Sequence, residues 1–593
     1  MTGRYGRSGR LNMTDIQAFL QQAFSAAIER ALGTGFAGTD PVVRCANDST
    51  HGDWQANFAM SLAKRAGRPP RAIAEAVVAA VELGGIASSV EVAGPGFVNI
   101  RLTDAFLETM MAELVADQRC GVSIAAHRDI VAIDYSAPNV AKEMHVGHIR
   151  STIIGDALSR VLEFLGHQVL RRNHLGDWGT QFGMLIEHVV ELGKTSGQHH
   201  DIGDLNALYR ESKARFDLDP DFAERARHRV VALQAGEPDT VGFWKQLIVE
   251  SKKHFGKIYA QLGVRLADED YFGESFYNSM LAPVMDELVA AGVAVESEGA
   301  VCVFPPGFKG RDGEPVPLIV RKGDGGYGYD ATDLAALRHR IHDLKATRLI
   351  YVVGAPQKQH FDMIFAAGKM AGWLKDGISA EHVPFGSILG EDGKPFKTRA
   401  GDNVKLTDLI DEALRRARTI VTEKSPSLAE TEKDGIASAI GIGAIKYVDL
   451  CNDRIKDYVF SWDRMLAFEG NTAPYLQNAY VRIQGIFRKA AEAGVSIGAA
   501  AIRLGTAEER ALAMQMLKLG DVLDQVSRSL EPHRLCTWLY DLASIFHGFY
   551  EKCPVMNAEN AAIKASRLAL CREVGRCLQL GLSLLGIATI DQM

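Results

Sequence analysis

The chain has 593 residues, of which 47% are hydrophobic and 23% are charged, and its formal net charge is −7. At roughly 100–200 residues per domain, this length predicts about three to five domains, and the composition is ordinary for a globular protein. The negative charge excludes a strongly basic chain that coats nucleic acid, but it allows local basic patches that contact RNA.

Eight cysteines are scattered along the chain, and no two have the C-x-x-C spacing of a zinc ribbon or knuckle. They form no recognisable disulfide framework, which indicates a reducing compartment. No apolar run approaches the ~20 residues of a membrane span, and the basic start of the chain lacks the apolar stretch of a secretory signal. We therefore expect a cytoplasmic protein with no membrane partner and no metal site of its own.

The first part of the chain predicts a small α+β domain over residues 13–125. Apolar residues recur at helical spacing over 14–35, and a second helix is expected at about 70–83. Residues 90–102 alternate as a strand and are interrupted by a Gly-Pro-Gly triplet. Residues 1–12 are polar and rich in Gly and Arg, and we interpret them as a flexible extension, with RNA binding as the alternative.

The middle of the chain predicts a parallel sheet. Residues 130–136 (IVAIDYS) are expected to form a strand, 149–165 a helix with one apolar face, and 167–175 the next strand. Strand, helix and strand within about 45 residues are typical of a βαβ unit. We therefore predict a Rossmann-type domain over 126–422, with a polar, mostly helical insertion at about 190–300.

The remaining elements complete a multidomain α/β protein. A buried strand at 348–355 and a helix at about 361–373 continue the sheet domain. Residues 423–435 are polar, and we expect a loop or linker there, at the start of a connecting helical stretch over 423–469. Residues 470–593 carry the apolar stripes of an α-helical bundle.

His145, Val146, Gly147 and His148 lie where the first predicted strand of the sheet turns into its helix. A helix N-terminus has free N–H groups and partial positive charge, and therefore attracts phosphate. Two imidazoles three residues apart can donate to phosphate oxygens from one side, and Gly147 allows a nucleobase or sugar to approach the backbone. Alone, these four residues fit a structural or metal site equally well, but a strand–helix switch point favours a nucleotide.

Longer blocks around these residues resemble the arginyl-tRNA synthetases, which are class I aminoacyl-tRNA synthetases. In chain order the blocks are GPGFVNI (94–100), DYSAPNVAKEMHVGHIRST (134–152), GDWGTQFG (176–183) and GNTAPYLQNAYVRI (470–483). The resemblance implies an enzyme that activates arginine with ATP and transfers it to arginine tRNA, releasing AMP and pyrophosphate. It also implies that Mg²⁺ accompanies ATP, and we expect a monomer.

The resemblance assigns ATP binding to His145, Gly147 and His148, and the two histidines are expected to stabilise transition-state charge. The second signature of the class is degenerate here, in GEDGKPFKTRAGDNVKL. One register places Lys394 and Lys397 on its lysines, and another aligns Phe396-Lys397-Thr398-Arg399 with its last four residues. The catalytic candidates in this loop are therefore Lys394, Lys397 and Arg399, with Lys397 also at ATP. A basic surface loop is the alternative.

Some arginyl enzymes with a degenerate loop are thought to use a lysine just before the His-x-Gly-His residues. Lys142 occupies that place in this sequence. The resemblance also implies an arginine pocket made of Asp134, Ser136, Asn139, His145, Tyr329, Asp333 and Gln357. Carboxylates and oriented hydrogen bonds suit a planar guanidinium, which is always charged.

Several pocket residues have a simpler interpretation. Asp134, which stands where some relatives have Glu, could simply end a strand, and Asp333 could be an ordinary carboxylate near a helix N-terminus. Gln357 could belong to a plain loop. Tyr329 and Asp333 are four residues apart, so they share a face if that stretch opens a helix. Trp178 is more consistent with packing than with chemistry.

The resemblance also points to tRNA contacts in the first and last domains. Phe97 and Asn99 match the aromatic-x-Asn pair that contacts the D-loop, because an aromatic face and an amide can stack on and bond a splayed base. A core role for Phe97 is the alternative. The anticodon candidates are Tyr475, Gln477, Tyr480, Arg482 and the terminal Met593, against packing or solvent exposure.

Two other functions are compatible with parts of the sequence. A small nucleotidyltransferase can share the H-x-G-H residues, but it would not need an N-terminal module and about 120 residues of C-terminal helices. A catalytically dead protein that binds RNA or senses arginine would be favoured by loss of either histidine, and both are present.

Overall fold

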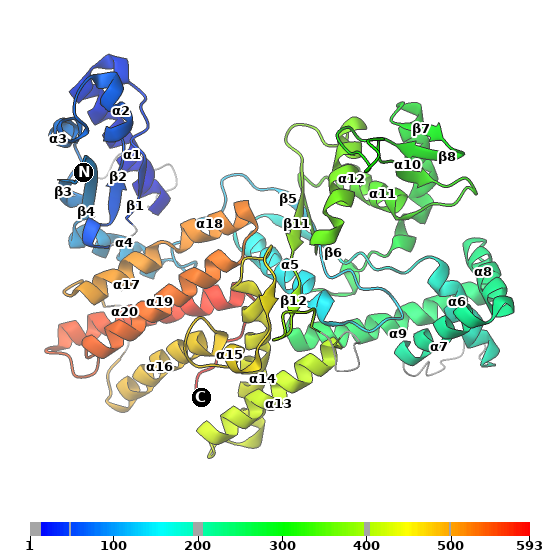
Figure 1. Cartoon of the computed structure of the whole chain (residues 1–593). Helices are drawn as coiled ribbons and strands as arrows, with labels where there is room; N and C mark the ends of the chain where they lie inside the picture. Colours follow the sequence, from blue (N-terminus) through cyan, green and yellow to red (C-terminus); the bar gives the residue numbers. More distant parts are fainter. Residues whose placement is uncertain (1–12, 47–48, 194–204, 397–403, 497, 499) are drawn as a thin grey trace.

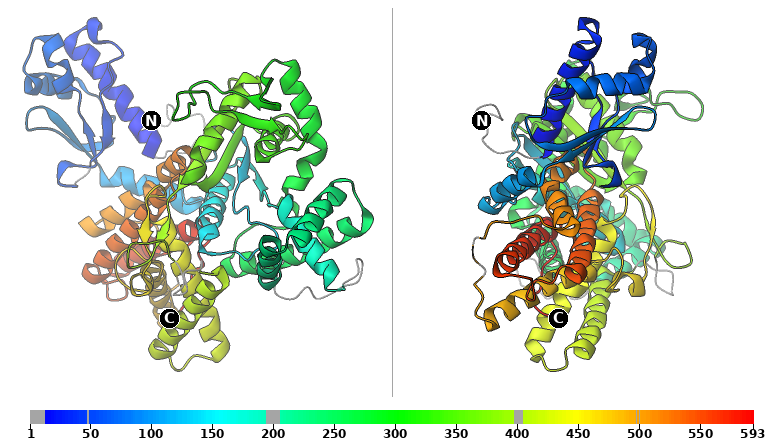
Figure 2. Two further views of the ribbon diagram at one scale, coloured as in Figure 1. Left: turned by 45° about the vertical axis from the view of Figure 1, so that its right-hand side comes forward. Right: turned by 90° about the vertical axis from the view of Figure 1, so that its left-hand side faces the viewer.

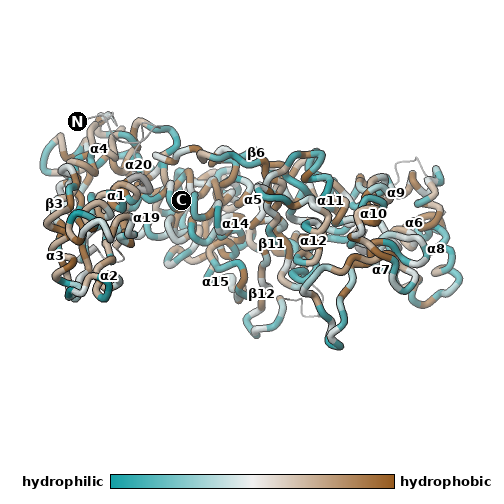
Figure 3. The backbone as a smooth tube through the Cα atoms, turned by 90° about the horizontal axis from the view of Figure 1, so that it is seen from above, coloured by the Kyte–Doolittle hydropathy of each residue, from teal (hydrophilic) through white to brown (hydrophobic). Residues whose placement is uncertain are grey.

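The computed structural model describes residues 13–46, 49–193, 205–396, 404–496, 498 and 500–593. The protein is extended, with an N-terminal module at one end and helices α6–α8 at the other (Figures 1 and 3). The sheet domain lies between them, and a bundle of long helices lies beside the module. The predicted extension over residues 1–12 lies outside the described residues. No helix in the described part of the chain is long and apolar enough to cross a membrane.

The N-terminal module is a four-stranded antiparallel sheet packed against helices. Its strand order is β1-β2-β4-β3. The elements are α1 (Met13–Leu32), β1 (Val43–Cys45), β2 (Trp54–Ala56), α2 (Ala59–Ala66), α3 (Pro70–Ala80), β3 (Ala87–Ala93), β4 (Phe97–Leu102) and α4 (Asp104–Ala116). The strand predicted at 90–102 is a hairpin, because the Gly-Pro-Gly triplet forms its turn. Strands β1 and β2 have only three residues each, too few to produce a visible alternation.

The central sheet is entirely parallel, in the order β11-β10-β5-β6. It contains β5 (Ile130–Asp134), α5 (Val146–Phe164), β6 (Gln168–Arg172), β10 (Arg348–Gly354) and β11 (Ser379–Phe385). The predicted βαβ unit and Rossmann-type fold class are confirmed. From β5 the chain crosses to β6 on one side, whereas β10 continues to β11 on the other. Ligands bind at such a switch point, beyond the carboxyl ends of the strands.

Residues between β6 and β10 form two substructures. Helices α6 (Thr180–Glu191), α7 (Leu205–Leu218), α8 (Pro220–Gln234) and α9 (Pro238–Leu262) make the helical insertion that the sequence predicts. They are followed by α10 (Asn278–Ala290), β7 (Ala294–Ser297), β8 (Ala300–Val303), β9 (Leu318–Arg321), α11 (Tyr329–His342) and, after β10, α12 (Lys358–Met370). The antiparallel β7-β8-β9 sheet was not predicted, because its four-residue strands are too short to show a period.

The C-terminal part is helical, as predicted. Its helices are α13 (Leu406–Lys424), α14 (Glu430–Leu450), α15 (Trp462–Met465), α16 (Ala473–Glu492), α17 (Ala507–Leu517), α18 (Leu519–Ser529), α19 (His533–Lys552) and α20 (Ala561–Leu584). Strand β12 (Ile388–Leu389), before α13, pairs in parallel with β13 (Tyr458–Val459), which lies between α14 and α15. The loop predicted at 423–435 is wrong in extent. Only five residues separate α13 from α14, and Arg418 pairs with Glu430 and Asp434 across the turn.

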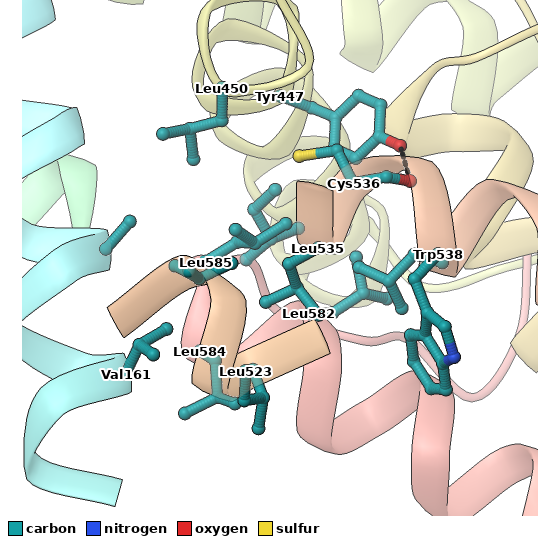
Figure 4. Packing of buried hydrophobic residues seen from close by; sticks show 14 of the residues in the cluster. Val161, Tyr447, Leu450, Leu523, Leu535, Cys536, Trp538, Leu582, Leu584 and Leu585 are labelled. Atoms are coloured by element: carbon teal, nitrogen blue, oxygen red, sulfur yellow. Dashed lines mark hydrogen bonds between the residues drawn. The ribbon is translucent and has the colours of Figure 1, made fainter. Parts of the chain in front are cut away.

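Helix α5 is buried along most of its length and is joined to α14 by two ion pairs of opposite sense. Arg150 of α5 lies 3.2 Å from Asp449 of α14, and Lys446 of α14 lies 3.7 Å from Asp156 of α5. All four side chains are at most 1% exposed. Burial lowers the pKa of Lys446 to about 8, although Asp156 opposes this shift. Farther along α5, Val161 packs against the bundle core (Figure 4).

The N-terminal module contacts the bundle, with α4 against α17 and α1 against α18, and the left view of Figure 2 shows the module next to these helices. Arg510 of α17 is the main polar link: its guanidinium donates to Asp53 at 2.5 Å and to the carbonyl oxygen of Leu102 at 3.0 Å, and it also pairs with Asp104. Because this guanidinium is largely buried, the module is held in one orientation against the bundle.

Gly155 tests the packing of α5 against the sheet. A Cβ at this position would lie 2.2 Å from Cγ of Tyr135, whereas a Cβ at the exposed helical Gly435 would meet nothing within 4 Å. We expect Gly155→Ala to destabilise the protein by about 1–3 kcal/mol through overpacking. Gly435→Ala should be neutral or stabilising by up to ~1 kcal/mol. Thermal unfolding of both variants measures this difference, and equal melting temperatures would contradict the packing described here.

Candidate functional site

His145 and His148 together cap the N-terminus of α5, because each side chain accepts a backbone N–H there. Nδ1 of His148 accepts the backbone N–H of His145 at 3.1 Å, and Nδ1 of His145 accepts that of Gly147 at 3.1 Å. Their ring centroids are 4.1 Å apart. A Cβ at residue 147 would lie 2.8 Å from Cε1 of His145, so glycine is needed here for the imidazole itself. This reason was not predicted, since the sequence suggested only room for a ligand.

Both imidazoles are neutral N–H donors at neutral pH. Burial, with a smaller contribution from His145, lowers the pKa of His148 to about 4. Burial followed by the charge of Lys142 lowers the pKa of His145. Because each Nδ1 accepts a backbone N–H, the single ring proton of each histidine is placed on Nε2. The start of α5 therefore offers two side-chain donors besides its free backbone N–H groups.

The second signature loop is joined at its base to the same residues. The N–H of Val146 donates to the carbonyl oxygen of Val404 at 2.9 Å, and the N–H of Leu406 donates to that of Met144 at 2.9 Å. On the other side of the loop, the ring of Phe396 packs on Phe460. Lys397 and Arg399 lie outside the described residues. Both described ends of the loop are thus fixed, one of them directly beside the histidines.

Two lysines predicted to be catalytic lie in different settings. Lys394 is exposed in a tight turn, where its N–H donates to Asp392 at 3.1 Å. Lys142 is half-buried, with its ammonium 4.6 Å from the ring centre of Tyr209 in the helical insertion. Its charge acts on both histidines, which places it near the N-terminus of α5.

The second and third sequence blocks, 134–152 and 176–183, meet at Gly176. The N–H of Val140 donates to the carbonyl oxygen of Gly176 at 3.0 Å, and the N–H of Gly176 donates to that of Pro138 at 3.2 Å. A Cβ at Gly176 would lie 2.1 Å from Oδ1 of Asn139. The glycine therefore lets the exposed Asn139 side chain lie over the backbone, at the carboxyl edge of the sheet.

Asp134 and Ser136 are already engaged inside the protein. Asp134 ends β5, and its carboxylate accepts from the guanidinium of Arg340 at 2.5 Å, where Arg340 is 1% exposed. Ser136 is buried, and its hydroxyl lies 2.7 Å from that of Tyr259 and 2.8 Å from that of Thr152. Neither side chain presents its polar atoms to an open cleft, which favours supporting roles over direct contact with a ligand.

A polar cluster forms where α11 and α12 begin. Tyr329 is the first residue of α11 and is 66% exposed, and Asp333 lies one turn later on the same face. His360 of α12 lies 2.6 Å from Asp333 and 3.4 Å from Asp330, and its ring is 5.1 Å from that of Tyr329. Although burial opposes it, these two carboxylates raise the pKa of His360 to about 9.

Glu274 is a candidate that the sequence analysis missed. It opens a short 3₁₀ helix (Glu274–Tyr277) after α9 and is half-buried. Burial raises its pKa to about 7, and the carboxylates of Asp177 and Asp333 add to this shift. A partly buried carboxylate beside Asp177 and Asp333, with no ion pair to a cation among the described residues, is suited to receive a positively charged ligand. Its sequence neighbourhood carries no motif, so only the fold reveals it. Gln357, also predicted, is exposed at the start of α12.

Phe97 and Asn99 lie on the open face of the N-terminal sheet. The alternate residues Val98, Ile100 and Leu102 are at most 1% exposed, whereas Phe97 and Asn99 are half-buried. Asn99 accepts a hydrogen bond from Gln55 at 2.8 Å. The alternative of a core position for Phe97 is therefore wrong.

The candidates in the bundle divide between surface and interior. Tyr475 and the exposed Arg482 lie on α16, where both contact His547 of α19. Gln477 is 0% exposed, and its amide donates to the carbonyl oxygens of Ala439 and Ala588. The prediction that Gln477 contacts RNA is contradicted, because it ties α14 to the C-terminal segment. Tyr480 is 7% exposed, and Met593 is half-buried.

Taken together, the arrangement offers phosphate donors at the start of α5, flanking lysines, and a cluster of carboxylates across the switch point. Such a site can orient a nucleotide and a small cationic molecule towards each other. The imidazoles are neutral and no described nucleophile is held against a base, so the geometry suits charge stabilisation rather than covalent catalysis.

Comparisons with known proteins cover nearly the whole chain. The family described as "tRNA synthetases class I (R), catalytic domain" matches residues 109–462. The "Arginyl tRNA synthetase N terminal domain" matches 18–102, and the "DALR anticodon binding domain" matches 476–593. The arginine–tRNA ligase of Frankia casuarinae is 52% identical, covering 96% of this chain and 97% of its own. The arginine–tRNA ligase of Thermobifida fusca is 49% identical, covering 98% of this chain and 100% of its own.

Solved structures agree with these matches. The crystal structure of arginyl-tRNA synthetase from Plasmodium falciparum superposes with a TM-score of 0.84 at 32% identity, covering 98% of this chain and 99% of that one. The arginyl-tRNA synthetase from Thermus thermophilus has a TM-score of 0.78 at 24% identity, covering 97% and 100%, and shows the same fold.

The geometry separates the buried carboxylate of Asp134 from the more exposed carboxylate of Asp333. Asp134 is the sole anionic partner of the buried Arg340 among the described ion pairs. Asp134→Asn should therefore cost about 3–5 kcal/mol by leaving that charge unpaired. Asp333→Asn should cost no more than ~1 kcal/mol, since His360 keeps Asp330. Thermal unfolding without ligand tests this order, and a D134N protein as stable as D333N would contradict it.

Proposed function

Because the chain belongs to the arginyl-tRNA synthetases and is an ATP-dependent arginine–tRNA ligase of class I, we propose that ATP lies along the start of α5 and arginine lies across the switch point. The arginine carboxylate attacks the α-phosphate, forming arginyl-adenylate and releasing pyrophosphate. A terminal ribose hydroxyl of the tRNA then takes the arginyl group, and AMP leaves. This membership excludes a small nucleotidyltransferase, and the presence of both histidines argues against a catalytically dead protein.

The roles of His145 and His148 rest on one observation: two neutral imidazoles direct their Nε2–H groups from the N-terminus of a buried helix. A neutral donor needs no deprotonation or rearrangement as charge develops on the α-phosphate, so it stabilises the transition state from a fixed position. Lys142 and Lys394, with Lys397 and Arg399 of the second loop, are proposed to act on the leaving pyrophosphate. Mg²⁺ is proposed to accompany the ATP phosphates and to neutralise part of their charge.

For arginine, we propose Tyr329, Asp333 and Glu274 around the guanidinium, with Asn139 and Gln357 at the rim. Two carboxylates with oriented oxygens match the planar, bidentate guanidinium. The ammonium of lysine would leave part of this set unpaired, so a site built in this way rejects lysine by about 10⁴-fold or more. Asp134 and Ser136 are proposed to shape the pocket from behind, since their polar atoms are engaged internally.

For tRNA, we propose that Phe97 and Asn99 contact the D-loop, because the open sheet face gives an aromatic ring beside an amide. Tyr475 and Arg482, with Met593 at the chain end, are proposed for the anticodon. The proposed domains are 13–125 for the D-loop, 126–422 for catalysis, 423–469 for the linking helices that contact the stem, and 470–593 for the anticodon. Cytoplasmic location and a monomeric state stay predictions.

Arginine-dependent ATP–pyrophosphate exchange, with and without arginine tRNA, tests this assignment of roles. The resemblance to the family implies that exchange requires tRNA. We expect wild-type exchange only when tRNA is present, and we expect His148→Ala to reduce it by at least 100-fold while sparing the fold. Exchange without tRNA would remove the tRNA requirement, and near-wild-type exchange by H148A would refute the role of His148.

Glu274 gives arginine affinity a specific pH dependence. With a pKa of about 7 in the free enzyme, this carboxyl is protonated below that pH, and a guanidinium can bind its ionised form only after the proton leaves. Arginine affinity should therefore fall by up to ~10-fold per pH unit as the pH drops below about 7, and level off above it. Calorimetric titration of arginine between about pH 6 and 8 measures this. In Glu274→Gln the affinity should be lower and flat; the same slope in both proteins would contradict the assignment.

A further inference from the structure

Three residues with a Cβ adopt left-handed backbone between the end of β5 and the start of α5. The φ angles are 73° at Ser136, 45° at Ala137 and 61° at Ala141. This conformation is unfavourable for residues other than glycine, because Cβ approaches the neighbouring carbonyl oxygen. Such strain persists where surrounding contacts impose it, and it gathers at functional sites. Contacts from outside the loop must therefore hold this segment in shape.

Each of the three strained N–H groups is bonded by a side chain from a different element. Ser136 N donates to Ser151 Oγ of α5 at 2.8 Å, Ala137 N donates to Asn173 Oδ1 after β6 at 2.9 Å, and Ala141 N donates to Ser251 Oγ of α9 at 2.9 Å. The first two partners belong to the βαβ unit itself. The third comes from the helical insertion, 110 residues later in the chain.

Helix α9 makes a second contact with the same loop through Tyr259. Its hydroxyl lies 2.7 Å from Oγ of Ser136 and accepts a hydrogen bond from Nδ2 of Asn173 at 3.0 Å. Ser251 and Tyr259 are each 1% exposed, and their spacing of eight residues places them on one face of the helix. In Figure 1, α9 leads from the insertion back towards the sheet. The insertion thus reaches both ends of the strained segment.

A buried serine within a helix is usually explained by its own helix, since its hydroxyl can donate to the carbonyl oxygen four residues earlier. Ser212 of α7 is an example: it is 0% exposed and donates to Leu208 at 2.6 Å. Ser251 makes the same bond to Leu247 at 2.8 Å, but its oxygen also accepts the N–H of Ala141. The two serines therefore differ in one contact, the hydrogen bond that Ser251 accepts from the N–H of Ala141 in the loop.

We propose that Ser251 and Tyr259 are positioning residues for arginine activation. They hold the loop in its left-handed shape and thereby place Lys142, which follows Ala141 directly, and Asn139, which lies over Gly176. This inference rests on the proposed role of Lys142. His145 and His148 are fixed by their own helix cap, so they do not depend on α9. Loss of the α9 contacts should therefore disturb catalysis more than the binding of ATP.

The matched pair Ser251→Ala and Ser212→Ala tests this in the full-length enzyme with arginine tRNA. In pyrophosphate exchange, we expect S251A to lower kcat by at least about tenfold while KM for ATP changes by less than about threefold. S212A should stay within about twofold of wild type, and the two variants should have similar melting temperatures. Tyr259→Phe should act in the same direction as S251A. Equal kcat values for S251A and S212A would overturn the proposal.

A second-site change separates the loop strain from general damage. Ala141→Gly removes the Cβ that makes left-handed backbone unfavourable, so the loop needs less external support. The double variant S251A/A141G should recover most of the kcat lost in S251A, and failure to recover it would refute the mechanism. Lys142→Ala is measured alongside: full activity in K142A with a defect in S251A would locate the fault in the assigned role of Lys142 rather than in the loop contacts.

Discussion

The structure depends on the burial of helix α5, because this helix carries the capped His145 and His148 at its N-terminus and also lies between the sheet and the C-terminal helices. A buried charge is tolerated only with a partner. Arg150 and Asp156 are therefore matched by Asp449 and Lys446 of α14. The opposite sense of the two pairs permits one register between the helices, since sliding either helix would bring like charges together. Helix α14 is thus a structural part of the sheet domain to which α5 belongs, in keeping with the family match over residues 109–462.

The site follows the same logic of fixed polar groups. Each imidazole of the H-x-G-H residues accepts a backbone N–H on Nδ1 and keeps its proton on Nε2, which sets both the tautomer and the direction of the donor. Across the switch point, the carboxylates are graded: Asp134 is neutralised by Arg340, Asp333 is shared with His360, and Glu274 has no described cation beside it. This gradation leaves negative charge where a guanidinium is expected and removes it from the interior.

The sequence predicted the elements that are long enough to show a repeated apolar pattern. It also predicted the site residues that lie in contiguous sequence blocks. It revealed the βαβ unit, the bundle stripes and the histidine pair, because each leaves a local pattern. It missed the three-residue strands of the N-terminal sheet, the β7-β8-β9 sheet and Glu274, which have none. It assigned Gln477 to RNA binding. In the structure, Gln477 is buried and its amide donates to the carbonyl oxygens of Ala439 and Ala588, which are over a hundred residues apart in the chain. Local sequence could not show that contact, nor the one between Ala141 and Ser251.

The strand order of the central sheet also has a consequence for how the protein is made. Strand β5 lies between β6 and β10, and β10 ends at Gly354, well over two hundred residues after β5. At about 5–20 residues per second, a ribosome needs roughly 10–40 s to add this stretch. During that interval β5 has a neighbour on only one side, and its other edge is open to pairing with foreign chains. The helical insertion is synthesised in the same interval, so it is available to cover the nascent βαβ unit before the sheet can close.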